Sequence, residues 1–288
     1  MPKGVSGMRI LYENYKELPS HRTRYWGALR FMYGVTGKLT VMFTGTASNH
    51  HPRKLPSNLQ SHFLNHHTSA YPPNPLLIEG FNLYARYRLV SLDGQQKHLR
   101  VAIYGEGAKS FAPHDEAEPV LMGDNSGLGG GMIITQLYKK FAVSLTAGYA
   151  YPFPYKDQDL GLSFRSGDMY SYNISMGYRI FPFTYSDYSD INVNFYVEFI
   201  NRHYQGAQMV VNGKEYDFEQ FKHVEPFTYN SLQENKYSEI RPSIQIIVNS
   251  NNRIDLGIAQ PFIGRSYLHF YPVYYLSFQK YFFPPKKK

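Results

Sequence analysis

Apolar and polar side chains alternate with a period of two residues along most of this chain. In LTVMFTGTAS (39–48), leucine, valine and phenylalanine share one face and mainly threonines share the other. The pattern returns in FAVSLTAGY (141–149) and INVNFYVEF (191–199). Because successive side chains on a strand point to opposite faces, each segment predicts a β-strand with one apolar and one polar side. An all-β fold is therefore expected.

The predicted strands are long. Most reach ten residues, whereas soluble strands average about 5–6 and a tilted strand needs about 9–11 to cross the hydrocarbon layer of a membrane. We therefore predict one domain over 1–288, a transmembrane antiparallel up-and-down β-barrel of about twelve strands, with almost no helix. The expected strands lie near 5–13, 24–34, 38–48, 77–91, 97–111, 126–138, 140–152, 168–181, 190–203, 237–249, 252–261 and 267–283.

The connections between these segments alternate in length. The short ones are predicted at 35–38, 91–96, 138–140, 183–189 and 250–253, and the longer ones at 14–23, 49–76, 112–125, 153–167 and 204–236. Only the brief segment 262–265 departs from this order. Outer-membrane barrels have short periplasmic turns and long extracellular loops. This sorting places both termini in the periplasm and makes 49–76 and 204–236 long extracellular loops.

Aromatic residues make up 17% of the chain, with 27 Tyr and 20 Phe, which suits aromatic girdles at the two membrane interfaces. The last predicted strand, 267–283, ends in aromatics and resembles the terminal strand that bacterial outer-membrane assembly machinery recognises. Five residues follow Phe283, a departure from that pattern. Tyrosine-rich strands and asparagine-rich turns are similar to those of barrels from Bacteroidetes-type bacteria. The resemblance implies a location in the bacterial outer membrane, in contact with its lipid.

Residues 1–20 contain no apolar segment typical of a signal peptide. We expect the chain to represent the mature form of an exported protein, and a cytoplasmic protein is the competing interpretation. There is no cysteine, so disulfides and thiolate metal sites are excluded.

The net charge of +8 is predicted to lie on loops, lumen and tail, rather than to bind nucleic acid. If apolar residues face lipid, the opposite parity of each strand gives the lumen. A charge on the lipid face costs about 2–4 kcal/mol at the midplane, so this assignment has an energetic basis. The charged residues assigned to the lumen are Arg30, Arg86, Arg88, Arg100, Arg179, Arg202, Arg241, Glu106, Glu198 and Asp255.

Strand direction predicts the depth of these side chains. Five arginines are expected near the periplasmic end, with Asp255 as the only carboxylate at that level. Rings of Arg or Lys favour anions in pores. The alternative is that the arginines pair with carboxylates and tyrosines and fill the barrel as a polar core. The five arginines are Arg30, Arg86, Arg88, Arg100 and Arg179.

The first long loop carries NHHPRKLPSNLQSHFLNHH (49–67), with five of the eleven histidines. His62 and His66 are four residues apart, which aligns them on one helical turn. Imidazole binds Zn and Cu, so a metal site is predicted here and no other cofactor is expected. The alternative is an exposed polar loop, because the segment contains no Asp or Glu. The candidate ligands are His50, His51, His62, His66 and His67.

Three functions are compatible with these features. The first is an outer-membrane channel or transporter for small anionic solutes. The second is a non-conducting surface receptor, metal-binding barrel or subunit of an envelope complex, for which another envelope protein would be the partner. The third is a lipid hydrolase, but Ser48 and His50 fall on the lumen parity rather than on the exterior. We therefore expect no enzyme activity.

Overall fold

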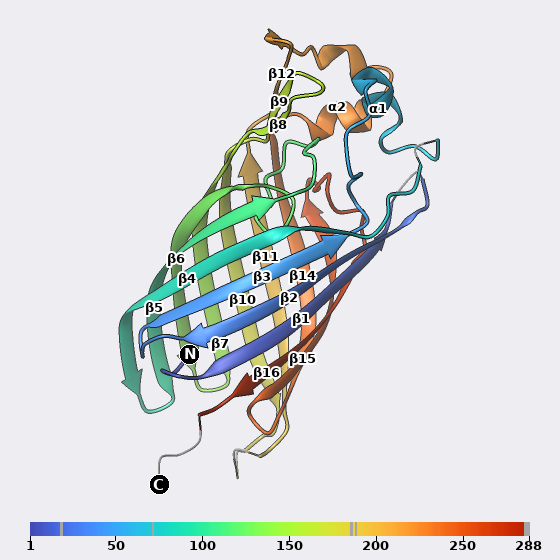
Figure 1. Cartoon of the computed structure of the whole chain (residues 1–288). Coiled ribbons are helices and arrows are strands. Elements are labelled where there is room, and N and C mark those ends of the chain that lie inside the picture. The colour runs from blue at the N-terminus through green and yellow to red at the C-terminus, as the bar shows by residue number, and fades with distance from the viewer. Residues whose placement is uncertain (18–19, 71, 185–186, 188, 285–288) are drawn as a thin grey trace.

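Twelve antiparallel strands close into one barrel in the computed structural model, which describes residues 1–17, 20–70, 72–184, 187 and 189–284 (Figure 1). This confirms the predicted fold class and strand number. The barrel strands are β1 (Ser6–Lys16), β2 (Thr23–Gly34), β3 (Leu39–Ser48), β4 (Leu77–Gly94), β5 (Lys97–Ser110), β6 (Gly127–Tyr138), β7 (Phe141–Pro152), β10 (Met169–Phe181), β11 (Asn192–Tyr204), β14 (Asn235–Val248), β15 (Asn252–Ile263) and β16 (Val273–Phe282).

Each barrel strand pairs with its neighbours in chain order, and β1 closes the barrel on β16 with Ser6 opposite Phe282. Closure leaves no unpaired sheet edge, so every strand can satisfy its backbone hydrogen bonds within lipid. Of the described residues, none belongs to a helix that is both long and apolar enough to cross a membrane.

The last strand is shorter than predicted. It begins at Val273 rather than at 267, because Pro272 has no N–H to donate to a ladder and because the preceding segment is held as a loop. There the Ser266 hydroxyl accepts hydrogen bonds from the backbone N–H groups of Leu268 and His269, each at 3.1 Å. The connection between β15 and β16 is therefore longer than the predicted 262–265. It joins the other long connections at the extracellular end of the barrel.

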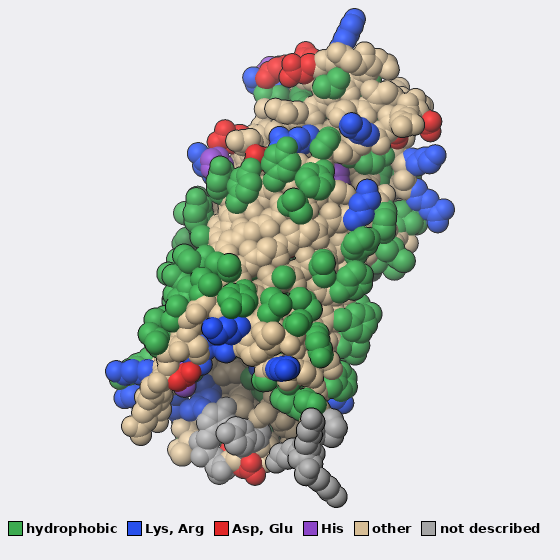
Figure 2. Space-filling view, turned by 60° about the vertical axis from the view of Figure 1, so that its left-hand side comes forward, with side chains coloured by type: hydrophobic (Ala, Val, Ile, Leu, Met, Phe, Trp, Pro, Cys, Tyr) green, Lys and Arg blue, Asp and Glu red, His purple; other side chains and the backbone are tan. Residues whose placement is uncertain are grey.

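Large hydrophobic side chains cover the outer wall of the barrel, and Lys and Arg gather toward its ends (Figure 2). Phe43 and Leu145 are each 47% exposed, although a soluble fold would bury them. The outward-facing valines at 143, 193 and 197 are half-buried among their neighbours. An apolar belt around a closed barrel faces lipid, which places the protein in a bacterial outer membrane as predicted.

Leu145→Lys is expected to lower the free energy of unfolding in lipid vesicles by about 2–4 kcal/mol, because its strand neighbours Ile134 and Ile174 place it in the middle of the apolar belt. Thr146→Lys is the control, since its side chain points to the lumen. Denaturant titration of both variants in vesicles measures the difference. Equal losses in the two variants would contradict the assignment of faces.

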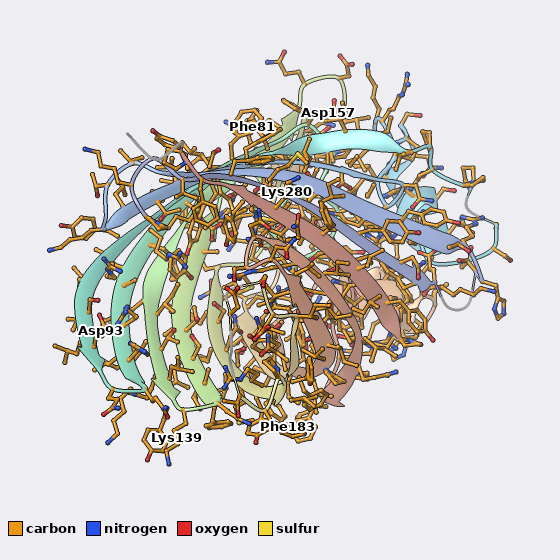
Figure 3. The ribbon with its side chains drawn as sticks, turned by 90° about the horizontal axis from the view of Figure 1, so that it is seen from below. Phe81, Asp93, Lys139, Asp157, Phe183 and Lys280 are labelled. Carbon is orange, nitrogen blue, oxygen red and sulfur yellow. The ribbon has the colours of Figure 1, made fainter. Side chains whose placement is uncertain are left out.

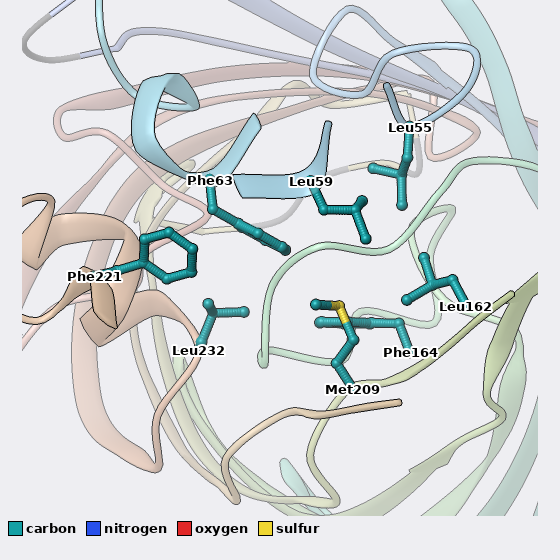
Figure 4. Packing of buried hydrophobic residues seen from close by; sticks show 8 residues of the cluster. All are labelled: Leu55, Leu59, Phe63, Leu162, Phe164, Met209, Phe221 and Leu232. Atoms are coloured by element: carbon teal, nitrogen blue, oxygen red, sulfur yellow. The ribbon is translucent and has the colours of Figure 1, made fainter. Parts of the chain in front are cut away.

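A small cap sits over the extracellular end of the barrel (Figure 1). It has a four-stranded sheet, two α-helices and one 3-10 helix, and its core is a cluster of eight buried apolar residues from three of the long connections (Figure 4). The cap therefore gives the predicted loops 49–76 and 204–236 a packed structure. Its elements are β8 (Tyr155–Asp157), β9 (Leu162–Arg165), β12 (Gln208–Val211), β13 (Lys214–Glu215), α1 (Leu59–Asn65), η1 (Glu219–Phe221) and α2 (Pro226–Ser231).

The connection between β5 and β6, residues 111–126, folds into the barrel as a plug loop. Residues 112–119 are all buried. Ala117 anchors the loop through its backbone, donating to the Ser231 carbonyl at 3.0 Å and accepting from the Gly167 N–H at 2.8 Å. At the tip of the loop, the Leu121 carbonyl accepts from Asn82 on the wall. The plug loop therefore occupies part of the extracellular half of the lumen.

Candidate functional site

Three arginines and one lysine surround a cavity of about 250 Å³ at the periplasmic end of the lumen. We call it the basic mouth; the charged residues that line it are Arg86 and Arg88 of β4, Arg100 of β5 and Lys38 of the β2–β3 turn. The Arg88 guanidinium donates to the Gly37 carbonyl at 2.7 Å, which fixes it across the turn. Among the described residues that line this cavity, none is a carboxylate.

Asp93 lies beside the basic mouth at the rim of the barrel (Figure 3). Its carboxylate accepts from Arg100 and from His98, each at 2.5 Å. A bulge in β4 between Arg88 and Val90 changes the strand parity and turns Asp93 inward. The prediction that Asp255 is the only carboxylate at this level is therefore wrong. Strict alternation along β4 would have pointed Asp93 outward.

Arg30 lies higher in the barrel than predicted. It is opposite Thr44 in β3, four residues above Thr40, which lines the basic mouth. Its guanidinium donates to the Thr44 hydroxyl at 3.0 Å and to the sulfur of Met122 in the plug loop at 3.4 Å. Arg30 therefore contacts the tip of the plug and is not part of the basic mouth. Its position reflects the length of β2, which continues to Gly34 before the turn.

Arg179 lies at the periplasmic rim, as expected, but in a different hollow beside Lys139 and Lys140. Asp255 lies three residues after the start of β15, where Arg9, the register partner of Arg30, binds it at 3.1 Å. Glu106 is at mid-barrel and accepts from Asn82 at 2.9 Å. Glu198 faces the lumen in register with Arg241 of β14. Of the five arginines predicted to form one ring, the structure brings together Arg86, Arg88 and Arg100.

The remaining two predicted arginines are held by buried carboxylates in the extracellular half. Arg202 binds Glu118 of the plug loop at 2.6 Å, and Arg241 binds Glu239 at 2.7 Å. Both arginines also line a cavity of about 210 Å³ between the plug loop and the wall. At this level the alternative of a polar core with paired arginines is the better description. Val120, Met122 and Asp124 of the plug loop form one side of this cavity.

The five predicted metal-ligating histidines are buried, not exposed on a surface loop. Their residue exposure ranges from 0% for His67 to 7% for His50. The loop 49–76 folds inward because helix α1 packs Leu59 and Phe63 into the core of the cap. Its N-cap Asn58 accepts from the Ser61 N–H at 3.0 Å. His62 of the same short helix is also buried and lies 3.2 Å from Asp115 of the plug loop.

Carboxylates from other segments meet these histidines. The Nε2 atoms of His62 and His66 lie 3.2 and 2.9 Å from the same Asp115 oxygen. His66 Nδ1 lies 3.1 Å from His67 Nε2, which is 3.8 Å from a Glu116 oxygen. We call this group the histidine–carboxylate cluster; its members are His50, His51, His62, His66, His67, Glu17, Glu79, Asp115, Glu116 and Asp124.

Three sets within the cluster bring their donor atoms close enough to hold a metal ion, since the donor atoms of each set lie within 4.8 Å of one another. The imidazole rings approach closely, as expected from the sequence, with ring centroids 5.0 Å apart for His62 and His66. Every residue of these sets is buried except Asp124, which is half-buried. The sets are His62, His66 and Asp115; His66, His67 and Glu116; and His51, Glu79 and Asp124.

Burial separates the protonation states within the cluster. Burial and the charge of His66 lower the pKa of His67 to about 4, so this ring is neutral at pH 7. Burial opposes protonation of His51 too, but the hydrogen bond and charge of Asp124 outweigh it and raise the pKa of His51 to about 10. Burial raises the pKa of Glu116 well above its usual range. The cluster therefore combines a neutral imidazole, a cationic imidazole and carboxyl groups within one buried region.

The carboxylates of the cluster could not be assigned from the histidine segment alone. The signal was present in the run HDEAEP (114–119), which concentrates acidic residues in a predicted extracellular connection. Neither this run nor Glu17 and Glu79 was predicted as part of a site. On the wall, parity would have identified Arg9 and Glu13, because both share the lumen face of β1. The inward folding of the polar plug loop was not predicted from the sequence.

Ser48 lies on the lumen side of the barrel wall, as its strand parity predicts. It is buried, and its hydroxyl donates to Glu79. The same hydroxyl accepts from the backbone N–H of His50 at 2.9 Å, while the His50 ring contacts Tyr15 at 3.3 Å. Ser48 and His50 therefore do not form a nucleophile–base pair facing lipid.

No family model and no curated protein sequence matches the chain. Solved structures do match it. An outer-membrane channel from Pseudomonas putida F1 superposes with a TM-score of 0.58 at 12% identity, covering 98% of this chain and 97% of that one. The NanC porin gives 0.46 at 11% identity over 97% and 99%, and outer membrane phospholipase A from Escherichia coli gives 0.39 at 8% over 96% and 88%. The first of these similarities supports the outer-membrane barrel fold.

Proposed function

We propose that this barrel is an outer-membrane channel for small anionic solutes. The observation that carries the proposal is the basic mouth, where Arg86, Arg88, Arg100 and Lys38 line one cavity without a carboxylate among its described lining residues. A cationic constriction between low-dielectric walls focuses its field and raises the local concentration of anions. Among the described residues, Arg86 and Arg88 make no ion pair with a carboxylate, whereas Arg100 binds Asp93 at the rim. Arg202 and Arg241, by contrast, are each held by a buried carboxylate.

The proposed path runs past the plug loop rather than through it. The upper cavity lies between the plug loop and the wall strands β1 and β2, with Leu11 and Trp26 on its wall side. The plug tip contacts the wall at the level of Asn82. Arg86 is four residues further along β4, which is roughly 13 Å toward the periplasm. A solute would therefore pass Arg30 and Met122 before it meets the basic mouth.

Uptake into proteoliposomes tests this proposal. A singly charged organic anion and a singly charged organic cation of equal size are compared in vesicles that carry the purified full chain. The anion should enter several times faster than the cation, and the ratio should fall above about 0.1 M salt because screening shortens the reach of the field. Equal rates, or faster entry of the cation, would contradict the proposed selectivity.

The buried plug loop favours a second candidate, a non-conducting surface receptor or a subunit of an envelope complex. Residues 112–119 are buried inside the barrel and narrow its lumen, and the cap above them offers a folded extracellular surface. This candidate would be favoured if vesicles take up neither solute. The result should hold both for the parent chain and for a variant whose plug loop is loosened, such as Glu118→Gln. The partner would then be another envelope protein that contacts the cap.

A further inference from the structure

His62, His66 and Asp115 present three donor atoms to one point. Both histidines come from α1 or its C-cap and the aspartate from the plug loop, so two chain segments contribute. A tetrahedral Zn²⁺ site with bonds of about 2.0–2.2 Å separates its ligand atoms by roughly 3.3–3.5 Å. The observed separations of 3.2 and 2.9 Å from the shared Asp115 oxygen are slightly shorter. Small side-chain adjustments would admit the ion.

Buried polar atoms beside this point have no hydrogen-bond partner among the described residues. They include the second Asp115 oxygen and His51 Nδ1, which face each other at 3.7 Å. Both carboxylate oxygens of Glu116 are also without a hydrogen bond, although this residue is only 4% exposed. A buried polar group without a partner is costly. A bound ligand beside these atoms would offset the cost of burying them.

We propose that His62, His66 and Asp115 bind a divalent transition-metal ion of the Zn²⁺ type within the cap. Two imidazole nitrogens and one carboxylate oxygen suit Zn²⁺ better than Mg²⁺ or Ca²⁺, which prefer all-oxygen sites. Three protein ligands leave a fourth position for water or another group. The proposal does not depend on conduction through the barrel.

A further feature supports this assignment. A hollow of about 440 Å³ in the cap is lined by His62 together with Pro52, Lys54 and Asn74, which gives the ion a route from outside the cell. The bound ion would connect α1 to the plug loop and so hold the extracellular end of the lumen closed.

Metal content and affinity of the purified full chain test the proposal. After chelation and equilibrium dialysis against Zn²⁺, the parent should retain about one tightly bound ion per chain. His62→Gln/His66→Gln and the near-isosteric Asp115→Asn should each weaken this binding by 100-fold or more. His21→Asn/His223→Gln removes two exposed histidines and should bind like the parent. The visible spectrum of the Co²⁺-loaded parent should show tetrahedral coordination by nitrogen and oxygen.

Circular dichroism of each variant separates loss of the site from loss of the fold. A folded His62→Gln/His66→Gln variant that binds Zn²⁺ as tightly as the parent would overturn the proposal. So would a parent chain that binds no more Zn²⁺ than the cluster variants. Glu116→Gln should keep the ion, because that carboxyl belongs to the neighbouring set. If Glu116→Gln abolishes binding while Asp115→Asn does not, the assignment to Asp115 is wrong.

Discussion

Glu118→Gln is expected to lower the free energy of unfolding by about 3–5 kcal/mol, because it removes the negative charge from a buried ion pair. The Glu118 side chain is 1% exposed and accepts from Arg202 Nη1 at 2.6 Å and from the Ser266 hydroxyl at 2.9 Å. The Tyr237 hydroxyl donates to it as well. Loss of the charge leaves the Arg202 guanidinium, which is 19% exposed beside the upper cavity, without its carboxylate partner.

The same contact joins the plug loop to strands β11 and β14, so the variant should also loosen the plug. Denaturant titration in lipid vesicles measures the stability, and limited proteolysis measures cleavage within residues 111–126. Glu219→Gln is the matched control, because Glu219 lies in an exposed part of the cap. If Glu118→Gln and Glu219→Gln unfold at the same denaturant concentration, Glu118 does not anchor the plug.

Arg86→Gln/Arg88→Gln should lower the anion-to-cation permeability ratio severalfold without unfolding the barrel. The two arginines lie on the lumen face of β4 and line the basic mouth. Glutamine keeps the length and polarity of these side chains but removes two charges from a space where the surrounding walls focus the field. Reversal potentials in planar bilayers under a salt gradient measure the ratio.

A variant with the same charge change elsewhere separates local from global effects. Arg53 and Lys54 are exposed in the extracellular loop that leads to α1. Arg53→Gln/Lys54→Gln should leave the permeability ratio close to that of the parent. If both double variants change the ratio equally, net charge rather than the basic mouth sets the selectivity.

The barrel itself could be predicted from the sequence because lipid imposes a simple rule on each strand. Alternation must persist for the thickness of the membrane, and closure requires that every strand has two partners. Alternation gave wrong predictions where the backbone departs from regular strand geometry. The bulge at Arg88–Val90 reversed the parity and brought Asp93 inward, and Pro272 delayed the last strand.

The candidate site was predicted in part. The histidines of 49–67 could be identified from their density and from the i, i+4 spacing of His62 and His66. Their partner Asp115 could not, because it lies 53 residues from His62 and meets it only when the plug loop folds inward. Alternation carries no information about loops, whose positions depend on packing such as that of Phe63 in the cap. The metal site stays a prediction.

The reversal potential of the parent chain in a planar bilayer tests the central claim most directly. With a tenfold gradient of a simple salt at low ionic strength, the proposed channel should show single-channel conductance and a reversal potential of the sign set by anion flow. A reversal potential of the cation sign, or no conductance from either the parent or Glu118→Gln, would contradict the proposal that this barrel is an anion-preferring channel.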